Sequence, residues 1–339
     1  MITFVISKDG KRLMPTSNVR KVRKLLRSGS AEIFRYRPFT IRLLYDTGND
    51  TQDIELTEDT GYQTIGISVK SEKHEHFSGE FELLNDEKKH HDEQRREHRR
   101  PRRNRKRYRK PRFDNRKGHK LAPSLKNKAD RHVDIIKDII EVCPVTSITL
   151  EMGEFDTQVL KAYQEGKPAP TGKGYQQDER YGYDTLRAAV LARDKHKCVI
   201  CDTEKGPFAV HHFGYWKNDR SNRISNLGTV CLGCHTHANH KKGGKLWGLE
   251  PTLGSFAPAA FMNTVRWYIY EQVKKFGIPV HITYGVSTKR VRIDRNLAKS
   301  HANDAYAMGD FHPRHRAHTG YYEKRRRNNR ILEKFYDAK

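Results

Sequence analysis

Long hydrophobic runs are what this sequence of 339 residues lacks most clearly. Hydrophobic residues make up 35% of the chain, and none of their runs approaches the length of a membrane-spanning helix. The chain also does not open with the basic and apolar segments of a signal peptide. We therefore expect a soluble intracellular protein of two or three domains, each with a modest hydrophobic core.

Cysteine is scarce, and four of the five cysteines form two Cys-x-x-Cys pairs. The pairs are Cys198 with Cys201 and Cys231 with Cys234. Each pair can aim two sulfurs at one point, and four thiolates at this spacing are typical of a tetrahedral structural zinc site. The fifth cysteine, Cys143, ends an apolar helical stretch, which favours a buried thiol over a catalytic one.

Negative charge is also in short supply, because 41 Asp and Glu stand against 66 Lys and Arg, a formal net charge of +25. This excess predicts a nucleic-acid partner, with acidic proteins as the weaker alternative. The basic residues concentrate at 95–117, a segment that we expect to become ordered on nucleic acid rather than to fold alone. Pro101 and Pro111 predict a helix that is kinked or begins at each proline, and a disordered basic linker is the alternative. The candidate nucleic-acid-binding side chains are Arg95, Arg96, Arg99, Arg100, Arg102, Arg103, Arg105, Lys106, Arg107 and Arg109.

The segment between and just after the cysteine pairs is rich in histidine. His211 and His212 are adjacent, and neighbouring residues on a strand point to opposite faces. One of them can therefore bind a divalent ion while the other activates water for phosphodiester hydrolysis. His235 and Asn239 stand four residues apart, which predicts one shared helix face. A purely structural zinc ribbon is the alternative, although the gap between the two cysteine pairs is longer than a ribbon needs.

Taken in order, these features resemble the HNH nuclease motif, a ββα-metal finger. The resemblance implies that His212 is the general base and that the side-chain amide of Asn226 positions the catalytic loop. The implied ligands of a divalent ion are His211, His235 and Asn239. The motif often has histidine at the last of these positions, so His237 or His240 is an alternative ligand.

Acidic residues stand at the ends of several predicted elements. Asp59 lies in an Asp-Thr-Gly turn, Glu151 follows a predicted strand, and His301 precedes Asp304 by three residues. Carboxylates that meet at neighbouring strand ends can hold two divalent ions, although each residue alone could simply end a strand or form a turn. The order DTG, TIGISV, LEMGEFD, cysteine segment and SHANDAYAMGD resembles a RuvC-like nuclease of the RNase H fold, split into three pieces. That resemblance implies that these four residues form a second catalytic site.

The remaining pattern predicts an α/β fold of short strands and amphipathic helices. Before the cysteine segment we expect strands at 2–7 and 31–46 around a basic helix at 19–27, a strand within 54–69, and a helix at 133–142 that leads into the strand SITLEM. After it we expect a helix at 258–276, strands at 279–285 and 289–293, and a helix from about residue 300.

The whole order of segments resembles the IscB family, transposon-encoded RNA-guided nucleases related to the CRISPR type II effectors. The stretch GKRLMPTSNVRK, which begins at Gly10, resembles the N-terminal PLMP domain of that family, and the resemblance covers about residues 1–310. Arg12 stands where the family usually has proline, and the Asp-Thr-Gly turn is often Asp-Pro-Gly. Neither departure removes a catalytic group.

The IscB resemblance implies a domain order as well as cofactors and partners. The implied domains are a PLMP-type domain at 1–50, RuvC pieces at 51–90, 121–175 and 251–312, an arginine-rich bridge helix at 91–120, an HNH domain at 176–250 and a basic tail at 313–339. The implied cofactors are structural zinc, catalytic Mg²⁺ or Mn²⁺ and a guide RNA. The implied setting is a monomeric protein in a ribonucleoprotein that cuts double-stranded DNA, in the cytoplasm of a prokaryote and associated with the nucleoid.

Relatives continue beyond this point into a domain that contacts the guide RNA and reads a short motif beside the target. Only residues 311–339 follow Asp310 here, so we expect a shortened chain with both nuclease centres but without that reader. Two other functions remain open. One is a guide-independent HNH endonuclease of the homing type, and the other is a nucleic-acid-binding remnant that does not cleave.

Overall fold

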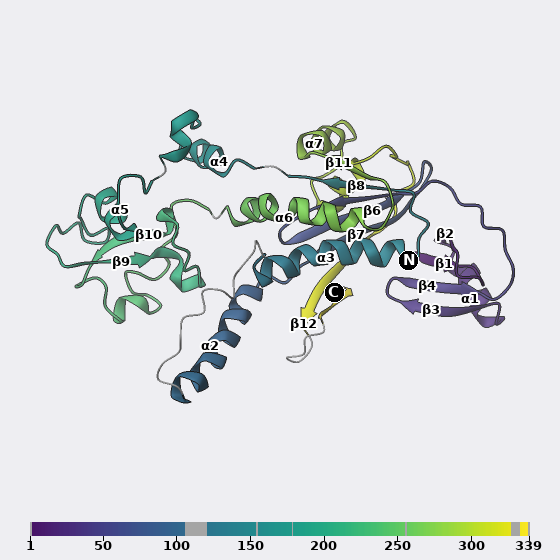
Figure 1. Ribbon diagram of the computed structural model, residues 1–339, viewed down its shortest axis with the longest axis horizontal. Coiled ribbons are helices and arrows are strands. Elements are labelled where there is room, and N and C mark those ends of the chain that lie inside the picture. The colour runs from purple at the N-terminus through teal and green to yellow at the C-terminus, as the bar shows by residue number, and fades with distance from the viewer. Residues whose placement is uncertain are drawn as a thin grey trace. The chain divides into compact units, whose positions relative to one another are not determined.

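The computed structural model describes residues 2–105, 121–153, 155–177, 179–254, 256–326 and 333–337. The chain divides into two compact units (Figure 1). Unit 1 consists of Met1–Phe155 and Pro258–Lys339, and unit 2 is Asp156–Ala257. Unit 2 is therefore an insertion between two parts of unit 1. Within the described ranges, no helix is both long and apolar enough to cross a membrane.

A four-stranded sheet with one helix opens unit 1. The strand order is β2-β1-β4-β3, in which β1 and β4 are parallel and the other pairs are antiparallel. Val22 anchors the helix in a small core with Ile41 and Leu43 of the sheet. The elements are β1 (Thr3–Ile6), β2 (Arg12–Thr16), α1 (Val19–Arg27), β3 (Ala31–Tyr36) and β4 (Phe39–Leu43).

A mixed seven-stranded sheet forms the centre of unit 1, in the order β11-β8-β5-β6-β7-β12-β13. Strands β5, β6 and β7 run antiparallel in succession, β8 and β11 extend the sheet parallel to β5, and β12 is parallel to β7. The strands are β5 (Glu55–Asp59), β6 (Thr64–Lys70), β7 (Glu75–Glu82), β8 (Ser147–Glu151), β11 (Val280–Thr283), β12 (Thr319–Arg326) and β13 (Glu333–Asp337).

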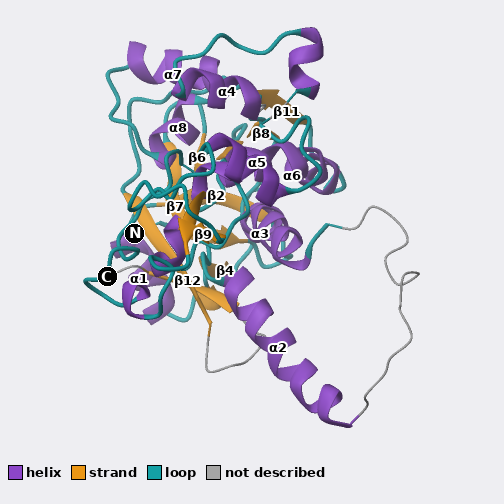
Figure 2. Ribbon diagram, turned by 90° about the vertical axis from the view of Figure 1, so that its left-hand side faces the viewer, coloured by secondary structure: helices purple, strands orange, loops and turns teal. Residues whose placement is uncertain are grey.

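The two faces of this sheet differ in polarity. One face packs helices α3 (Pro123–Ile140) and α6 (Ala257–Lys274) into the main hydrophobic core, which includes Leu56. The other face contacts α8 (His301–Ala307), where Thr57 donates a hydrogen bond to the Ala305 carbonyl. Because side chains alternate along a strand, Glu55, Thr57 and Asp59 all belong to the α8 face. Figure 2 shows the strands in orange with helices around them.

Unit 2 is built on a two-stranded antiparallel sheet of β9 (Phe208–His212) and β10 (Leu227–Cys231). Helix α5 (Leu186–Arg193) packs on β10, and a small core gathers two of the cysteines with Val230 and Leu246. Before it lie α4 (Thr157–Gln164) and the 3-10 turn η2 (Gly172–Gln176). The other 3-10 turns are η3 (Phe213–Lys217), η4 (Ile224–Asn226) and η5 (Ala238–His240).

Two predictions from the sequence are corrected by this fold, and a third is narrowed. Residues 289–293 are not a strand but part of helix α7 (Gly285–Asp294), in which Val286, Val291 and Ile293 gave a misleading β-branched pattern. Residues 235–239 are not one turn of α-helix, because the chain enters the 3-10 turn η5, where the His240 N–H donates to the His237 carbonyl three residues back. Helix α2 (Glu87–Arg105) contains Pro101 within its length, so it does not begin at that proline, and Pro111 lies outside the described residues.

Other elements agree with the prediction or were missed. The basic helix at 19–27 and the strand at 147–151 form as predicted. Helix α3 begins earlier than expected because Pro123 occupies its first turn, where a missing N–H costs nothing. Strands β2, β7, β12 and β13 were not predicted.

Candidate functional site

Four cysteine sulfurs gather at one end of the β9–β10 sheet. The sulfurs of Cys198, Cys201, Cys231 and Cys234 all lie within 4.8 Å of one another, and Cys201 Sγ is 3.7 Å from Cys231 Sγ. A zinc–sulfur bond of about 2.3 Å in a tetrahedron places sulfurs roughly 3.8 Å apart, whereas a disulfide bond is only about 2.0 Å long. All five cysteines are free thiols, and Cys143 is buried away from this group. The donor set and its spacing therefore fit a structural zinc ion.

The backbone around Cys198 favours the thiolate form of this one cysteine, whereas the pKa of Cys201 is raised, in part by its hydrogen bond with Cys198. Burial raises the pKa of Cys198, but hydrogen bonds from the backbone N–H groups of Cys231, Ile200 and Cys201 outweigh it and lower that pKa to about 7. Asp202 has a left-handed backbone, with φ of 55°, which lets the knuckle turn tightly. Amide donors directed at sulfur are typical of a metal-binding knuckle, because metal ligation requires the deprotonated thiol.

A second cluster consists of three histidines, His211, His235 and His240. His211 Nδ1 is 3.3 Å from His235 Nε2, and each ring lies edge-on to the other two at centroid distances of 4.8–5.3 Å. His240 donates from Nδ1 to the Thr236 carbonyl at 2.7 Å, which leaves its Nε2 available as a ligand. His211 is only 4% exposed, and its Nε2 is a buried nitrogen without a hydrogen-bond partner.

The charge state of these histidines suits metal binding. Burial, followed by repulsion from His235 and His240, lowers the pKa of His211 to about 4. Burial and His240 likewise lower the pKa of His235. Both rings are therefore neutral at pH 7, which is the form that binds a cation. An unpartnered buried nitrogen on His211, beside the imidazoles of His235 and His240, fits a divalent metal ion.

Asn239 was the predicted last ligand, and its side-chain amide nitrogen donates to the Cys234 carbonyl at 2.9 Å. The third imidazole of the cluster is that of His240. His240 was one of the two alternatives that the sequence left open.

His212 follows His211 on β9 and is the partly exposed member of the pair. The Asn222 side-chain oxygen lies 3.0 Å from His212 Nε2, so Nε2 donates and Nδ1 is left to accept a proton. Asn222 lies in the loop between the strands and had no distinguishing signal in the sequence. This arrangement gives His212 the tautomer of a general base.

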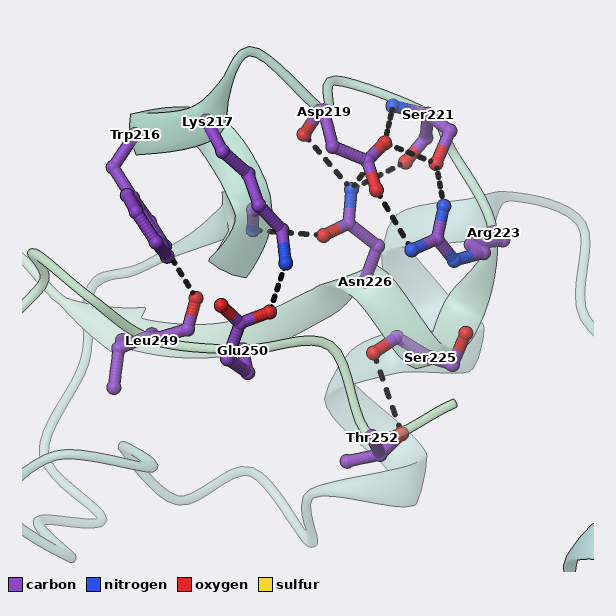
Figure 3. Close-up of polar contacts among 11 residues, drawn as sticks. Trp216, Lys217, Asp219, Ser221, Arg223, Ser225, Asn226, Leu249, Glu250 and Thr252 are labelled. Atoms are coloured by element: carbon purple, nitrogen blue, oxygen red, sulfur yellow. Dashed lines mark hydrogen bonds and ion pairs between the residues drawn. The ribbon is translucent and has the colours of Figure 1, made fainter. Parts of the chain in front are cut away.

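Asn226 holds the loop between β9 and β10 (Figure 3). Its buried side-chain oxygen accepts from the Gly214 N–H at 2.9 Å, and its amide nitrogen donates to the carbonyls of Asp219 at 3.1 Å and Ser221 at 3.0 Å. The sequence predicted this positioning role. Residues 249 and 250 contact the same loop from later in the chain. Trp216 donates a hydrogen bond to the Leu249 carbonyl, and the Lys217 ammonium forms an ion pair with the Glu250 carboxylate.

The acidic residues predicted for a second site meet in unit 1 at one edge of the seven-stranded sheet. Asp59 and Glu151 end the parallel strands β5 and β8, and Asp304 approaches from α8. His301 Nδ1 is 2.7 Å from Asp59 Oδ2. Among the described residues these carboxylates do not form a group as tight as the cysteine or histidine cluster.

Burial and mutual repulsion set the charges of the acidic group. Burial, and then the charge of Asp59, raises the pKa of Glu151 to about 7. The same two causes raise the pKa of Asp304, against an ion pair of 2.6 Å from Arg292 Nε. The hydrogen bond to Asp59 raises the pKa of His301. Carboxylates held close enough to repel one another are the arrangement that a bound cation stabilises.

Helix α7 supplies two contacts to this group that the sequence did not predict. Thr288 forms a hydrogen bond with Glu151, and Arg292 pairs with Asp304. The helix comes so close that a Cβ atom at Gly285 would lie 2.9 Å from Glu151 Oε1. Because the pattern at 289–293 predicts a strand, Thr288 and Arg292 could not be placed at the site from the sequence.

The basic candidates lie on helix α2 as far as the structure describes them. The side chains of Arg95, Arg96, Arg99, Arg100, Arg102 and Arg105 are exposed there. Arg103 also belongs to α2, whereas Lys106, Arg107 and Arg109 lie outside the described residues. Arg95 has an ion pair with Asp92 at 3.6 Å. The helix thus presents a row of cations to solvent.

A comparison with curated proteins finds no match to this chain. The comparison with protein families matches the RRXRR protein family over residues 3–178, which is more than half of the chain. The matched range contains Asp59, Glu151 and α2, and it ends before the cysteine and histidine clusters. At 99–103 the chain has the string RRPRR, which agrees with the letters of the family's description. The chain therefore belongs to the RRXRR protein family.

Proposed function

We propose that this chain is an RNA-guided DNA endonuclease of the IscB type, with HNH and RuvC sites that hydrolyse opposite strands of a duplex. The observation that carries the proposal is the arrangement in unit 2, where the four-sulfur cluster, the three-histidine cluster and His212 surround one small sheet. A structural zinc ribbon needs only the four sulfurs. It gives no reason for a buried histidine with an unpartnered nitrogen beside a base of defined tautomer.

In the proposed HNH reaction His212 is the general base. Because Nε2 donates to Asn222, Nδ1 accepts a proton from a water molecule whose oxygen bonds to phosphorus. The bond from phosphorus to the leaving oxygen breaks, and that oxygen takes a proton from solvent. His211, His235 and His240 would hold a divalent ion, which would supply positive charge to stabilise the phosphate oxygens. Asn226 keeps the loop after His212 in place through its three backbone contacts.

The second proposed site is the acidic group at the edge of the seven-stranded sheet. Three successive antiparallel strands followed by two parallel ones, in the order β7-β6-β5-β8-β11, are what we expect of an RNase H-type core. Asp59, Glu151 and Asp304 would hold Mg²⁺ or Mn²⁺ through their oxygens, which are the ligands that these ions prefer. His301 orients Asp59 through their hydrogen bond.

The proposed partners are a guide RNA and a DNA duplex. The exposed arginines of α2 support a phosphate backbone as the ligand, and the overall charge of +25 agrees with it. In this division of labour base pairing with the guide selects the target, while the protein holds the backbone of the heteroduplex.

Programmable cleavage tests the proposal. RNA that we expect to co-purify with the protein is sequenced and resynthesised with one of two different guide segments. The protein is then combined with this RNA and with DNA duplexes that match either guide, and the absence of any co-purifying RNA would contradict the proposal. We expect Mg²⁺-dependent cuts that move to the second duplex when the guide is exchanged. Cleavage that ignores the guide would instead support a homing-type endonuclease, and binding without cleavage in Mg²⁺ and Mn²⁺ would support a non-cleaving remnant.

A further inference from the structure

Helix α1 carries a concentration of positive charge that neither proposed nuclease site uses. Five of its nine residues are Lys or Arg, none is acidic, and all five basic side chains are exposed. They are Arg20, Lys21, Arg23, Lys24 and Arg27. Among the residues that the structure describes, none of the five forms an ion pair or a side-chain hydrogen bond. They are free to bind a ligand.

Four of these side chains share one surface. Arg20, Arg23, Lys24 and Arg27 follow a spacing of three and four residues, which places them along one face of the helix. Together with Ser28 they line a hollow of about 490 Å³ that has no acidic or aromatic side chain in its wall. Cations repeat along this face at intervals of about one helical turn, ~5.4 Å. A row of cations with this spacing fits an extended polyanion better than a single small anion.

The charges in the first turn of α1 are unfavourable for the helix, whereas Lys24 and Arg27 in its last turn are favourable. The N-terminal end of a helix carries partial positive charge, yet Arg20 and Lys21 occupy the first turn without any acidic residue. Like charges three and four residues apart, such as Arg20 with Lys24, repel one another. The helix is held by its Asn18 cap, which accepts from the Lys21 N–H at 2.9 Å, and by the packing of Val22. Proteins keep locally unfavourable residues mainly where those residues serve a function. The unfavourable charges of α1 therefore indicate a functional surface.

The apolar residues of α1 decide which polyanion fits. Val22 is buried, and Leu25 and Leu26 pack against the four-stranded sheet. The helix therefore has no apolar face to insert into a membrane, as an interfacial amphipathic helix does. It also has no aromatic side chain on which an unpaired base could stack. Cations alone, without a stacking platform, suit the backbone of a duplex.

We propose that the basic face of α1, formed by Arg20, Arg23, Lys24 and Arg27, is a second nucleic-acid-binding surface that contacts the phosphates of a duplex. The surface shares no residue with helix α2 or with either proposed catalytic site. It binds without regard to sequence, because phosphate contacts carry no base information. The inference does not depend on cleavage, so it stands or falls independently of the proposed nuclease function.

The test compares variants of the full chain by binding to a short RNA duplex and to a DNA duplex of the same sequence, in magnesium-free buffer across a salt series. In Arg20→Gln/Arg23→Gln we expect the slope of log affinity against log salt to fall by roughly 1–2, with roughly 10- to 30-fold weaker binding at physiological salt. The unfolding temperature of the free protein should rise by roughly 1–3 °C, because repulsion within α1 is removed.

Two further variants serve as controls. Arg20→Lys/Arg23→Lys keeps the charges and should bind like the parent. Lys126→Gln/Lys167→Gln removes the same total charge from lysines already paired at 2.7 Å with Asp130 and Glu165, and should leave the slope unchanged. Polyglutamate and phosphatidylserine vesicles are the competing probes.

Three results would overturn the proposal. The first is duplex binding that is unchanged in the Gln variant, or lowered equally in the Lys126→Gln/Lys167→Gln control. The second is a loss confined to polyglutamate or vesicles, which would assign the surface to another partner. The third is weaker binding together with a lower unfolding temperature, which would make Arg20 and Arg23 structural residues of α1.

Discussion

In unit 2, side chains that are close in the sequence have different roles in the fold and in the proposed HNH site. His211 and His212 leave β9 on opposite faces, one buried in the histidine cluster and the other hydrogen-bonded to Asn222. Asn226 joins the ends of the loop that follows them. The proposed HNH chemistry thus depends on a loop whose backbone groups are held by one buried side chain.

Asn226→Asp tests this dependence at constant shape. A carboxylate cannot donate to the carbonyls of Asp219 and Ser221, so two hydrogen bonds become repulsive contacts in a buried place. We expect unit 2 to lose about 2–4 kcal/mol of stability, measured by denaturant unfolding of the full chain with tryptophan fluorescence. Asn218→Asp, in the same loop but exposed, should change stability by less than about 0.5 kcal/mol. Equal effects of the two changes would contradict the assigned role of Asn226.

The raised pKa of Glu151 predicts that the effect of magnesium on stability depends on pH. Its pKa is raised by burial and by Asp59 to about 7, so the folded state favours the protonated carboxyl. The stability that this gives is complete below the unfolded pKa near 4.5 and is lost as the pH rises through about 7. A cation at the ionised group offsets the loss. We therefore expect Mg²⁺ to raise the unfolding temperature of unit 1 more at pH 8 than at pH 6.

Glu151→Gln is the control for that measurement. It removes the titrating group and should give a smaller magnesium effect that is the same at both values of pH. If the parent and Glu151→Gln respond alike at pH 6 and pH 8, the acidic group does not bind the ion through Glu151.

At the scale of elements, the spacing of residues in the sequence predicted those helices, strands and clusters that short-range backbone geometry determines by itself. Helix α1, the strand β8 and the meeting of four cysteines follow from short-range patterns. Helix α7 did not, because its β-branched residues favour a strand. The spacing also did not single out His240, which meets His211 and His235 only in the folded chain.

Helix α2 gives the prediction at this scale. Replacing Arg99, Arg100, Arg102 and Arg103 together by Gln removes up to four phosphate contacts. The salt dependence of RNA binding should become shallower by roughly 3–4 in slope for a duplex-like backbone. Structured RNA and plain duplex DNA are compared across a salt series, for the parent and the variant. A parent that binds both equally, with a variant that loses only DNA, would favour the guide-independent homing-type enzyme.

At the scale of the whole molecule, unit 2 is inserted into the chain of unit 1. The two units are stabilised by different interactions. Unit 1 has a large hydrophobic core on one face of its seven-stranded sheet. Unit 2 gathers few buried apolar side chains, and two of its core members are cysteines of the sulfur cluster. The pairing of β12 and β13 with the sheet could not be inferred from the sequence, because strand pairing over such a separation leaves no local signal.

Loss of the zinc site should therefore unfold unit 2 and leave unit 1 folded. Metal analysis should give about one zinc per chain. Cys231→Ser should unfold unit 2 while unit 1 keeps its own cooperative transition, as seen by calorimetry or hydrogen exchange. Cys143→Ser is the matched control, because this buried thiol belongs to the core of unit 1 and not to the cluster. Zinc-free protein with a normally folded unit 2 would refute the zinc assignment.

The central claim is that two separate sites cut opposite strands, and strand-resolved cleavage tests it most directly. A guide-matched duplex labelled differently on its two strands is incubated with Mg²⁺ and the parent, His212→Ala or Asp59→Ala protein. The parent should cut both strands, His212→Ala only the displaced strand, and Asp59→Ala only the strand paired with the guide. Loss of both cuts from either single change, with RNA binding intact, would contradict the account, as would two variants that both cut like the parent.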